Sequence, residues 1–532
     1  MRLSGSPVAC GPWRHGSTKR TLPCGGANFC ALPASDDRPD REASMPFSFS
    51  ATYTQLPARL FRRVPPAPVP QPTLLAVNAP LADLLGVSVA ELTSPAGIEV
   101  LAGNRHPDGA DPIALAYAGH QFGSFVPQLG DGRAVLLGEV VGPDGRRWDV
   151  QLKGAGPTPF SRGGDGRAAL GPVLREYVVS EAMAALGVPT TRALAAVLTG
   201  APVFRDTVLP GAVLARVASS HLRIGTFQYF AARQDRDMLV LLTDAALARH
   251  FPHADVRHGR ALALLDAVMA AQAQLVACWQ ALGFVHGVMN TDNMAISGET
   301  LDYGPCAFLD GFDPQRTFSS IDHGGRYAYA NQPQIAHWNL TRLAECLLPL
   351  VDDDAQRAVV AVTGHLDTFG AQFEAAYAAQ FRRKLGLFEV RSGDAELVRH
   401  LLAGMASSHV DFTNFFRSLS DSLLGDTPAA LAASFHDPEQ WATWWHPWRA
   451  RLAQEGRPLT EHVDRMRAAN PMYIPRNHRI EAMIAAAHQG DLQPFERLVR
   501  VLGRPYDAQP DAVDLAEAPG PAQWQYRTFC GT

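Results

Sequence analysis

The pattern of apolar and polar positions predicts strands in the earlier part of the chain and helices in the later part. Residues 134–141 and 147–153 are two apolar runs, and the Pro-Asp-Gly sequence at 143–145 between them favours a tight turn. The second run alternates apolar and polar residues, which places Lys153 on the face opposite the apolar side chains. We therefore expect a β-hairpin that presents Lys153 to a ligand; a solvated lysine at a strand end is the alternative.

A helix is expected after this hairpin. Residues 173–186 have helical spacing, with Pro172 before them and a Gly-Val-Pro sequence after them. The segment carries Glu176 and Glu181, and a carboxylate on such a helix can pair with Lys153 and fix its ammonium group. Glu176 is the first choice and Glu181 the second, while a surface glutamate without a partner is the third interpretation.

Helical spacing dominates the later part of the chain. Residues 260–282 form a long run that ends at Gly283, which predicts a helix leading into a loop. Residues 307–309 have the composition of a short strand, and beyond residue 335 the chain is again mostly helical, with the tryptophans of 441–445 as packing residues. The combined pattern predicts an α+β fold. No run of eighteen consecutive apolar residues occurs, which argues against a transmembrane helix.

The composition is that of a protein with a substantial core. The 532 residues are 47% hydrophobic and 19% charged, and the net charge of -5 argues against a nucleic-acid-binding protein with a basic face. The cysteines lack paired C-x-x-C spacing, which argues against a zinc site or a secreted disulfide framework and favours a reducing compartment. Cys530 is either an accessible thiol that pairs with another cysteine and gates access to substrate, or an inert one.

Residues 1–44 differ from the rest of the chain. They contain three of the seven cysteines, several Gly and Pro residues and no helical or strand periodicity, and their first acidic residue is Asp36. We expect an unstructured extension, or a start assigned too early, with Met45 as the true first residue. A transit peptide, which would place the protein in mitochondria, is the alternative.

Two glycine-rich segments surround Lys153. Residues 117–133 contain four glycines, and residues 154–167 contain a second cluster. Glycines let backbone amides approach an anion closely, so both segments are candidates for phosphate binding, with ordinary turns as the alternative. Arg216 and Arg223 lie in an otherwise apolar region, where two guanidinium groups suit a polyphosphate and structural ion pairs equally well.

The most specific chemistry lies in His286-Gly-Val-Met-Asn-Thr-Asp-Asn293, which is followed by Asp302-Tyr-Gly304. This is the ligand set of a kinase-like active site. Asp292 is an acid that can orient a hydroxyl, and Asn293 can ligate a cation. The Asp-aromatic-Gly sequence can hold the same cation. Two details differ from ordinary kinases: Asp292 directly precedes Asn293, and the interval to Asp302 is short. These details favour an unusual nucleotide pose.

These motifs, in this order, resemble the selenoprotein O family, known in bacteria as YdiU proteins. The resemblance covers about residues 47–532 and rests on YAGHQFG, LGDGR, QLKGAG, GDGR, LREY, HGVMNTDN, the Asp-Tyr-Gly at 302–304, NPMYIPRN at 470–477 and the terminal FCGT. It implies a protein-kinase-like bilobal fold. Residues 45–235 would form a small β-containing N-lobe with the glycine loops, the Lys strand and the Glu helix. Residues 236–532 would form a large, mostly helical C-lobe with the catalytic and metal loop, family-specific helices and the Cys530 tail.

The resemblance also implies an activity. ATP would bind in a flipped orientation, and AMP would pass to Ser, Thr or Tyr hydroxyls of proteins, the enzyme itself included; UMP transfer with manganese is a further activity attributed to bacterial members. Asp292 would be the proton acceptor, Asn293 and Asp302 would hold Mg²⁺ or Mn²⁺, and Glu176 would orient Lys153. The nucleotide-binding residues would be Gly130, Gly132, Arg133, Lys153, Asp165, Gly166, Arg216, Arg223 and Asp302.

Three functions compete at this point: a protein AMP transferase, an ordinary phosphotransferase that releases ADP, and a nucleotide-binding, redox-responsive pseudoenzyme. Lys153, Asp292, Asn293 and Asp302 are all present, which argues against the third, and the resemblance argues against the second. We expect ATP and protein substrates as partners, no nucleic acid and no membrane, and a cytoplasmic location.

Overall fold

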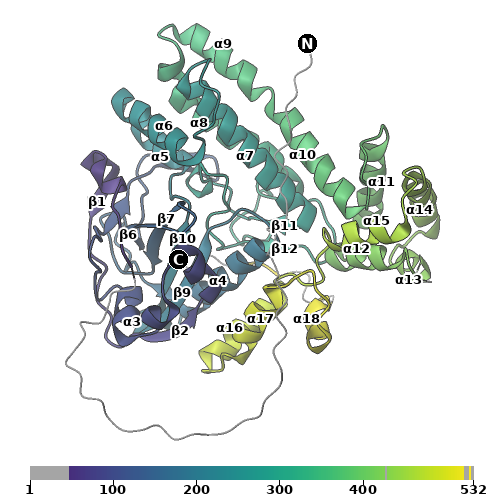
Figure 1. Cartoon of the computed structure of the whole chain (residues 1–532), viewed down its shortest axis with the longest axis horizontal. Coiled ribbons are helices and arrows are strands. Elements are labelled where there is room, and N and C mark those ends of the chain that lie inside the picture. Colours follow the sequence, from purple (N-terminus) through teal and green to yellow (C-terminus); the bar gives the residue numbers. More distant parts are fainter. Residues whose placement is uncertain (1–46, 426–427, 521–525, 529–532) are drawn as a thin grey trace, which may run out of the picture.

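The computed structural model describes residues 47–425, 428–520 and 526–528, and it combines one large sheet with helices on both of its faces (Figure 1). This confirms the predicted α+β class. Residues 1–44 and Cys530, for which the sequence makes predictions, lie outside the described residues.

The sheet is antiparallel throughout and follows the order β1-β3-β6-β7-β10-β9-β2, with the short β8 paired to β10. Its strands are β1 (Phe61–Arg63), β2 (Thr73–Val77), β3 (Ile113–Leu115), β6 (Ala134–Val141), β7 (Arg147–Lys153), β8 (Ala168–Ala169), β9 (Arg192–Phe204) and β10 (Val208–Ala218). Outside this sheet, two short antiparallel pairs are formed by β4 (Gly119–Gln121) with β5 (Ser124–Val126) and by β11 (Phe284–Val285) with β12 (Ala307–Phe308).

The predicted hairpin is confirmed as β6 and β7. Ala134 is opposite Lys153 at one end of the pair, and the turn closes the other end. The alternative of a solvated lysine is excluded, because Asp149, Gln151 and Lys153 are all buried. Helix α4 (Leu170–Ala185) packs on the neighbouring strands β9 and β10, and its Glu176 lies within hydrogen-bonding distance of the lysine. The sheet is therefore enclosed on both sides, with a polar interior next to α4.

The helices are α1 (Ala79–Leu85), α2 (Val89–Leu92), α3 (Pro95–Ala102), α4 (Leu170–Ala185), α5 (Ile224–Ala231), α6 (Arg236–His250), α7 (Arg260–Leu282), α8 (Gln332–Val351), α9 (Ala355–Leu366), α10 (Phe369–Lys384), α11 (Asp394–Ser407), α12 (Phe412–Asp421), α13 (Pro428–Ala432), α14 (Pro438–Ala453), α15 (Leu459–Arg467), α16 (Asn477–His488), α17 (Gln493–Leu502) and α18 (Val513–Ala516). Helices α1 to α3 pack on one face of the sheet and α4 on the other. The helix predicted over residues 260–282 is α7, with the same bounds. The helix predicted over 173–186 is α4, which begins three residues earlier, since Pro172 is tolerated in a first helical turn.

Helix α7 is by length and composition apolar enough to cross a membrane, although it contains no unbroken run of eighteen apolar residues. In the structure, 72% of its most apolar stretch is buried. It packs against α6, α8 and α10, and such burial is that of a core helix.

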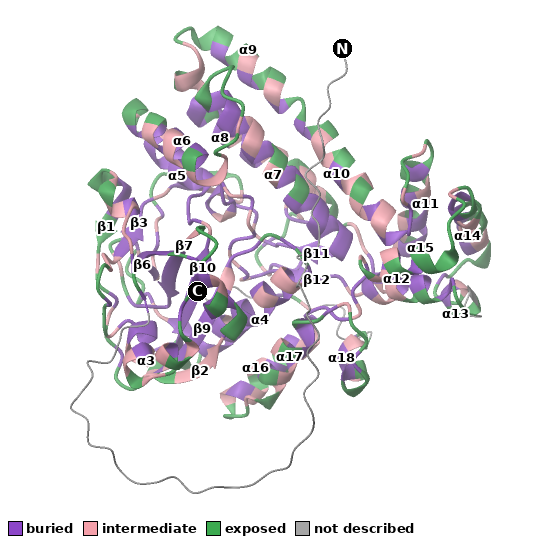
Figure 2. Cartoon of the chain, viewed as in Figure 1, coloured by how far each residue is buried: buried purple, intermediate pink, exposed green. Residues whose placement is uncertain are grey.

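Helices α11 to α15 form a second core with the end of α10, on the side of the molecule away from the sheet (Figures 1 and 2). Trp441 and Trp444 are buried in it, as the sequence predicts. Lys384 is buried there too, at 2% exposure, and its Nζ lies 4.1 Å from the ring centre of Phe416 and 5.2 Å from that of Phe412. Burial lowers the pKa of Lys384 to about 7.

A proline-rich strap, residues 64–72, crosses the sheet. The two strands it joins, β1 and β2, lie at opposite edges of the sheet. On its way the backbone NH groups of Ala67 and Gln71 donate to the carbonyls of Ala155, just after β7, and Thr199, in β9. Six spacings between strands amount to about 29 Å, and ten residue steps of extended, proline-rich chain reach about 31 Å. The strap must therefore be extended over its whole length.

Candidate active site

Lys153, at the end of β7, lies beside Glu176 on α4. Its Nζ donates to Oε2 of Glu176 at 2.5 Å, and NH1 of Arg216, on the neighbouring strand β10, lies 3.3 Å from Oε1 of the same carboxylate. None of the three side chains is more than 10% exposed. Glu181 instead pairs with Arg192 at 2.7 Å, so the first-choice glutamate is the partner. Two cations thus share one buried carboxylate, which fixes the lysine and the arginine in place.

Asp302 faces Lys153 from the connection between β11 and β12. Its Oδ1 accepts from Nζ of Lys153 at 3.5 Å and from the backbone NH of Gly304 at 3.1 Å. Its φ of +73° is unusual for a residue other than glycine and is held by the surrounding structure. Burial opposes ionisation, but the charges of Lys153, Arg133 and Arg216 hold the pKa of Asp302 well below its usual range. The carboxylate is therefore ionised, and at 27% exposure a ligand can reach it.

Asp292 lies ten residues before Asp302 in the same connection. Its Oδ2 accepts from Nε2 of Gln121 at 3.4 Å, and its Oδ1 has no hydrogen-bond partner among the described residues. Burial raises the pKa of Asp292 to about 6, although the charge of Arg223 lowers it. A Cβ at Gly119 would come within 2.5 Å of Oδ1, so the glycine leaves room for this oxygen. A carboxylate with a pKa near 6 and an open lone pair is suited to general-base chemistry.

A chain of buried polar contacts links these two parts of the site. NH2 of Arg216 donates to Oε1 of Gln151 at 2.5 Å, and Nε2 of Gln151 donates to Oδ2 of Asp131 at 2.9 Å. Oδ1 of Asp131 lies 3.8 Å from NH2 of Arg223, whose NH1 donates to the carbonyl of Asp292 at 3.1 Å. Both arginines predicted from the sequence are thus fixed by protein partners before any ligand binds.

The first glycine loop lies next to this cluster. Gly130 has a φ of +90°, and a Cβ there would come within 2.4 Å of the ring of Phe160, so packing as well as conformation requires a glycine. A Cβ at Gly132 would lie 3.0 Å from the carbonyl oxygen of Phe160. Arg133 follows and acts on Asp302 through its charge.

The second glycine loop is placed differently. Asp165 pairs with Arg205 at 2.9 Å and is 46% exposed. Gly166 has a φ of +63°, and a Cβ there would lie 2.0 Å from the carbonyl oxygen of Gly156. The described side-chain contacts of Asp165 are with Arg205 and the backbone of Arg167, not with the Lys153–Asp302 cluster. This pair of predicted site residues is therefore the one that the structure does not bring into the cluster.

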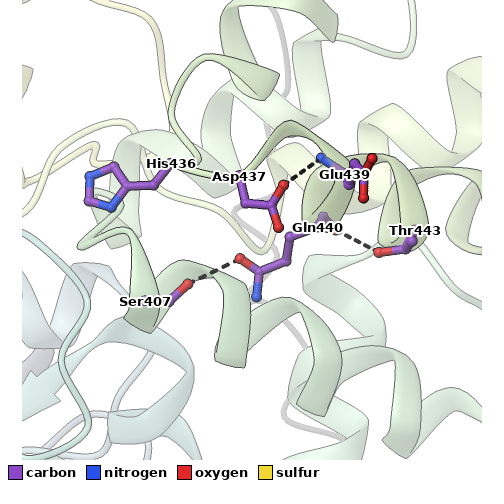
Figure 3. A pocket seen from close by; sticks show the side chains of 6 residues that line it. All are labelled: Ser407, His436, Asp437, Glu439, Gln440 and Thr443. Carbon is purple, nitrogen blue, oxygen red and sulfur yellow. Dashed lines mark hydrogen bonds between the residues drawn. The ribbon is translucent and has the colours of Figure 1, made fainter.

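A surface depression of about 550 Å³ lies elsewhere, between the end of α11 and the start of α14 (Figure 3). It is lined by Ser407, His436, Asp437, Glu439, Gln440 and Thr443. Figure 3 shows the 3.0 Å bond from Ser407 Oγ to Gln440 Oε1, and the side chains of Asp437 and Thr443 bonded to backbone groups of α14. It holds no cluster of cations comparable with that around Glu176. We therefore place the candidate site at the Lys153–Asp302 cluster, on its chemistry.

Comparison with known proteins identifies the family of the chain. The family model described as "Protein adenylyltransferase SelO" matches residues 44–503. The chain belongs to the SelO family. A relative from a Bradyrhizobium species is 58% identical over 487 residues, which are 91% of this chain and 99% of the relative. One from Methylorubrum populi is 58% identical over 494 residues and one from Rhodopseudomonas palustris is 55% identical over 487, each with the same coverage of both chains. All three relatives are named protein nucleotidyltransferase YdiU.

This SelO-family chain offers few cation ligands of its own. Among the residues that the structure describes, no group of three or more His, Cys, Asp or Glu side chains is arranged to hold a metal. Asn293 donates through Nδ2 to the carbonyl of Val288 at 3.1 Å, which leaves Oδ1 for a cation, and Asp302 supplies an ionised carboxylate. Mg²⁺ is commonly held by one or two protein ligands together with phosphate oxygens. The residues present therefore fit a cation that is shared with a nucleotide.

Several residues of the SelO-family site were missed by the sequence analysis. Thr291 Oγ1 accepts from the backbone NH of His120 at 2.7 Å and donates to Oε1 of Gln228 at 2.6 Å. Asn290 Oδ1 accepts from the backbone NH of Phe122 at 3.0 Å. The signal available in the sequence is YAGHQFG, whose glycines suit a phosphate loop and ordinary turns equally. Its backbone NH groups at His120 and Phe122 hold the loop that carries Asp292.

Proposed function

We propose that this SelO-family chain is a protein adenylyltransferase, which transfers AMP from ATP to a protein hydroxyl and releases pyrophosphate. The observation that carries the proposal is the buried Glu176 shared by Lys153 and Arg216, with Asp302 opposite and Asp292 in the same connection. The relatives' name, protein nucleotidyltransferase, supports a nucleotide as donor and a protein as acceptor. A phosphotransferase is the second candidate, because the same lysine–glutamate pair occurs in kinases.

In the proposed reaction the acceptor hydroxyl attacks the α-phosphorus of ATP. A bond forms between the hydroxyl oxygen and the α-phosphorus, the bond from the α-phosphorus to the oxygen that bridges to the β-phosphate breaks, and pyrophosphate leaves with that electron pair. The hydroxyl proton passes to Asp292, whose pKa of about 6 leaves it ionised at neutral pH. Lys153, Arg216 and Arg133 stabilise the phosphate charge, and Arg223 holds the backbone of the base.

The remaining predicted residues complete this proposal. Asn293 and Asp302 would hold a divalent cation, magnesium or manganese, which when bound neutralises phosphate charge and orients the phosphates. Backbone amides at Gly130, Gly132 and Gly166, with Asp165 at the outer end, would line a nucleotide bound in the flipped orientation.

A kinase-like bilobal fold belongs to the same proposal, with residues 45–235 as N-lobe and 236–532 as C-lobe. The strand lysine, the helix glutamate and the Asp-Tyr-Gly loop support it. The family resemblance supports three further proposals. They are UMP transfer with manganese, modification of Ser, Thr or Tyr hydroxyls, including those of the enzyme itself, and a cytoplasmic location. The buried thiols of Cys306 and Cys346 agree with a reducing compartment.

The test uses ATP labelled on the α- or the γ-phosphate, with magnesium or manganese and a protein extract as acceptor. We expect protein-bound α-label, release of pyrophosphate, and loss of both in Asp302→Ala, whereas Asp108→Ala at the exposed surface behaves as wild type. Protein-bound γ-label would instead establish a phosphotransferase. Nucleotide binding without transfer of either label would favour the redox-responsive pseudoenzyme.

A further inference from the structure

The loop that carries Asp292 is held by two segments that also reach the surface. The first is the β4–β5 hairpin, which contacts the loop through Gln121 and through the backbone NH groups at 120 and 122. The second is the segment 321–327, whose Tyr327 hydroxyl donates to Oδ1 of Asn290 at 2.7 Å. The rings of Phe122 and Tyr327 pack with centroids 5.1 Å apart, so the two segments form one unit beside the base.

The surface of this unit carries apolar side chains and stacked arginines. Phe125 is 41% and Ile321 59% exposed, although both are large apolar residues. The guanidinium carbons of Arg326 and Arg342 lie 4.7 and 4.9 Å from the ring centre of Trp338, in the second turn of α8. We call these residues, together with His120, the acceptor rim.

The carboxylates around the rim leave Arg326 without a counterion. Asp322 accepts from the backbone NH groups of Arg326 and Tyr327, and Glu345 pairs with Arg342 at 2.8 Å. No carboxylate of the described residues lies within ion-pair distance of the Arg326 guanidinium. That group is oriented by aromatic rings instead, and stacked arginines are pre-ordered to bind carboxylates.

The distance from the rim to the base suits a bound polypeptide. A Cβ at Gly123 would lie 3.6 Å from Cζ of Arg326, so the guanidinium contacts the turn of the hairpin. Gly123 is two residues from Gln121, which contacts Asp292, and two residues of strand span about 7 Å. With its own contact distance added, the guanidinium lies roughly 10 Å from the backbone of Gln121, whose side chain reaches Asp292. In an extended chain this corresponds to two or three residues.

We propose that the acceptor rim is the docking surface for the acceptor polypeptide, and that Arg326 selects hydroxyl residues with an acidic side chain a few positions away. The inference rests on the proposed transfer to protein hydroxyls and adds the chemistry of the acceptor. Phe125 and Ile321 supply apolar contact, and Arg342, although paired with Glu345, adds positive potential. That positive potential reaches the hairpin: burial lowers the pKa of His120, and the charges of Arg342 and Arg326 lower it further.

The test compares two random copolymers with equal tyrosine content, one of Glu and Tyr and one of Lys and Tyr, as acceptors of α-label from ATP. The full chain is expected to label the acidic copolymer at least tenfold faster. In Arg326→Gln the KM for that copolymer should rise about tenfold, the effect of losing one charge-assisted hydrogen bond, with the Kd for ATP unchanged. Arg326→Glu should shift the preference towards the basic copolymer.

Arg449→Gln is the matched control, because Arg449 also stacks on a tryptophan, with Cζ 5.6 Å from the ring centre of Trp445, but lies on α14. It should behave as wild type. Four outcomes would each overturn the rim proposal without touching the proposed function. Two concern the acceptors: equal labelling of both copolymers, or labelling of extract proteins but of neither copolymer. Two concern the variants: a loss of ATP affinity in Arg326→Gln, or the same defect in Arg449→Gln. Absence of α-label on every acceptor, the enzyme included, would remove the proposed function as well.

Discussion

Replacing the candidate base should stabilise the protein while it slows the reaction. Asp292 is 7% exposed, and burial raises its pKa from the ordinary value of 3.8 to about 6. The folded protein therefore binds this proton more tightly than the unfolded chain does. Stability falls as pH rises from about 4 through 6, and it stays lowered above that range. At 1.36 kcal/mol per pH unit, the ionised carboxylate costs about 3 kcal/mol at pH 8.

Asp292→Asn removes this cost with little change of shape and keeps an oxygen for Gln121. By the same linkage about 1.6 kcal/mol of the cost is already present at pH 5, so the advantage of the variant should be about 1.4 kcal/mol larger at pH 8 than at pH 5. The assay is urea unfolding in EDTA, followed by the fluorescence of the nine tryptophans, with Asp108→Asn at the surface as control. Transfer activity should fall by a factor of about 10² to 10⁴. A variant that is less stable than wild type at pH 8, or whose advantage does not change with pH, would refute the reasoning.

Four further outcomes are expected. Glu176→Gln should lower kcat at least 100-fold, because two cations lose their shared carboxylate. Glu181→Gln on the same helix should retain activity, and equal effects of the two changes in a transfer assay would contradict the assignment. Gly119→Ala should slow transfer about 100-fold with little change in the Kd for ATP, because the added Cβ would displace Asp292. Normal turnover of this variant would show that residue 119 does not confine Asp292. Lys384→Met should raise stability by about 5 kcal/mol at pH 6 and by about 1 kcal/mol or less at pH 10. The reason is that burial lowers the pKa of Lys384 from its ordinary 10.5 to about 7, and the resulting cost fades as pH rises towards 10.5. Thermal unfolding at both pH values checks this, and a pH-independent effect would argue against it. Manganese should bind more tightly in the presence of a non-hydrolysable ATP analogue than in its absence, since the described residues alone do not form a complete metal site. Calorimetry measures both affinities, and equal values would contradict a cation shared with the nucleotide.

The local parts of the site could be predicted from the sequence. The alternation in residues 147–153 and the turn before them give β7, and the helix that follows brings Glu176 back to Lys153, because such a helix packs on the sheet it has just left. The Asp-Tyr-Gly loop is equally local, since its chemistry lies within three residues.

The long-range parts could not be predicted in this way. Arg216 contacts Gln151 across 65 positions of the chain, and that contact exists only because β10 pairs with β7. Nothing in the composition of either segment indicates this pairing. The role of the YAGHQFG segment was obscured for a related reason: glycines that suit a phosphate loop equally suit a hairpin packed against a buried carboxylate. Gly119 makes room for Asp292, and Gly123 lies against Arg326.

The strap over residues 64–72 sets a limit on changes in chain length. Because it is already extended between opposite edges of the sheet, a deletion of one residue would shorten its reach by about 3 Å and force β1 or β2 out of register. Its middle also receives hydrogen bonds from Arg167, whose NH1 donates to the carbonyl of Ala67 at 3.2 Å, beside the second glycine loop. Loss of a single codon in this proline-rich stretch should therefore loosen both the sheet edge and that loop. An engineer who needs an insertion point for a label or a fused domain would do better elsewhere, for example at the exposed turn around Gly145.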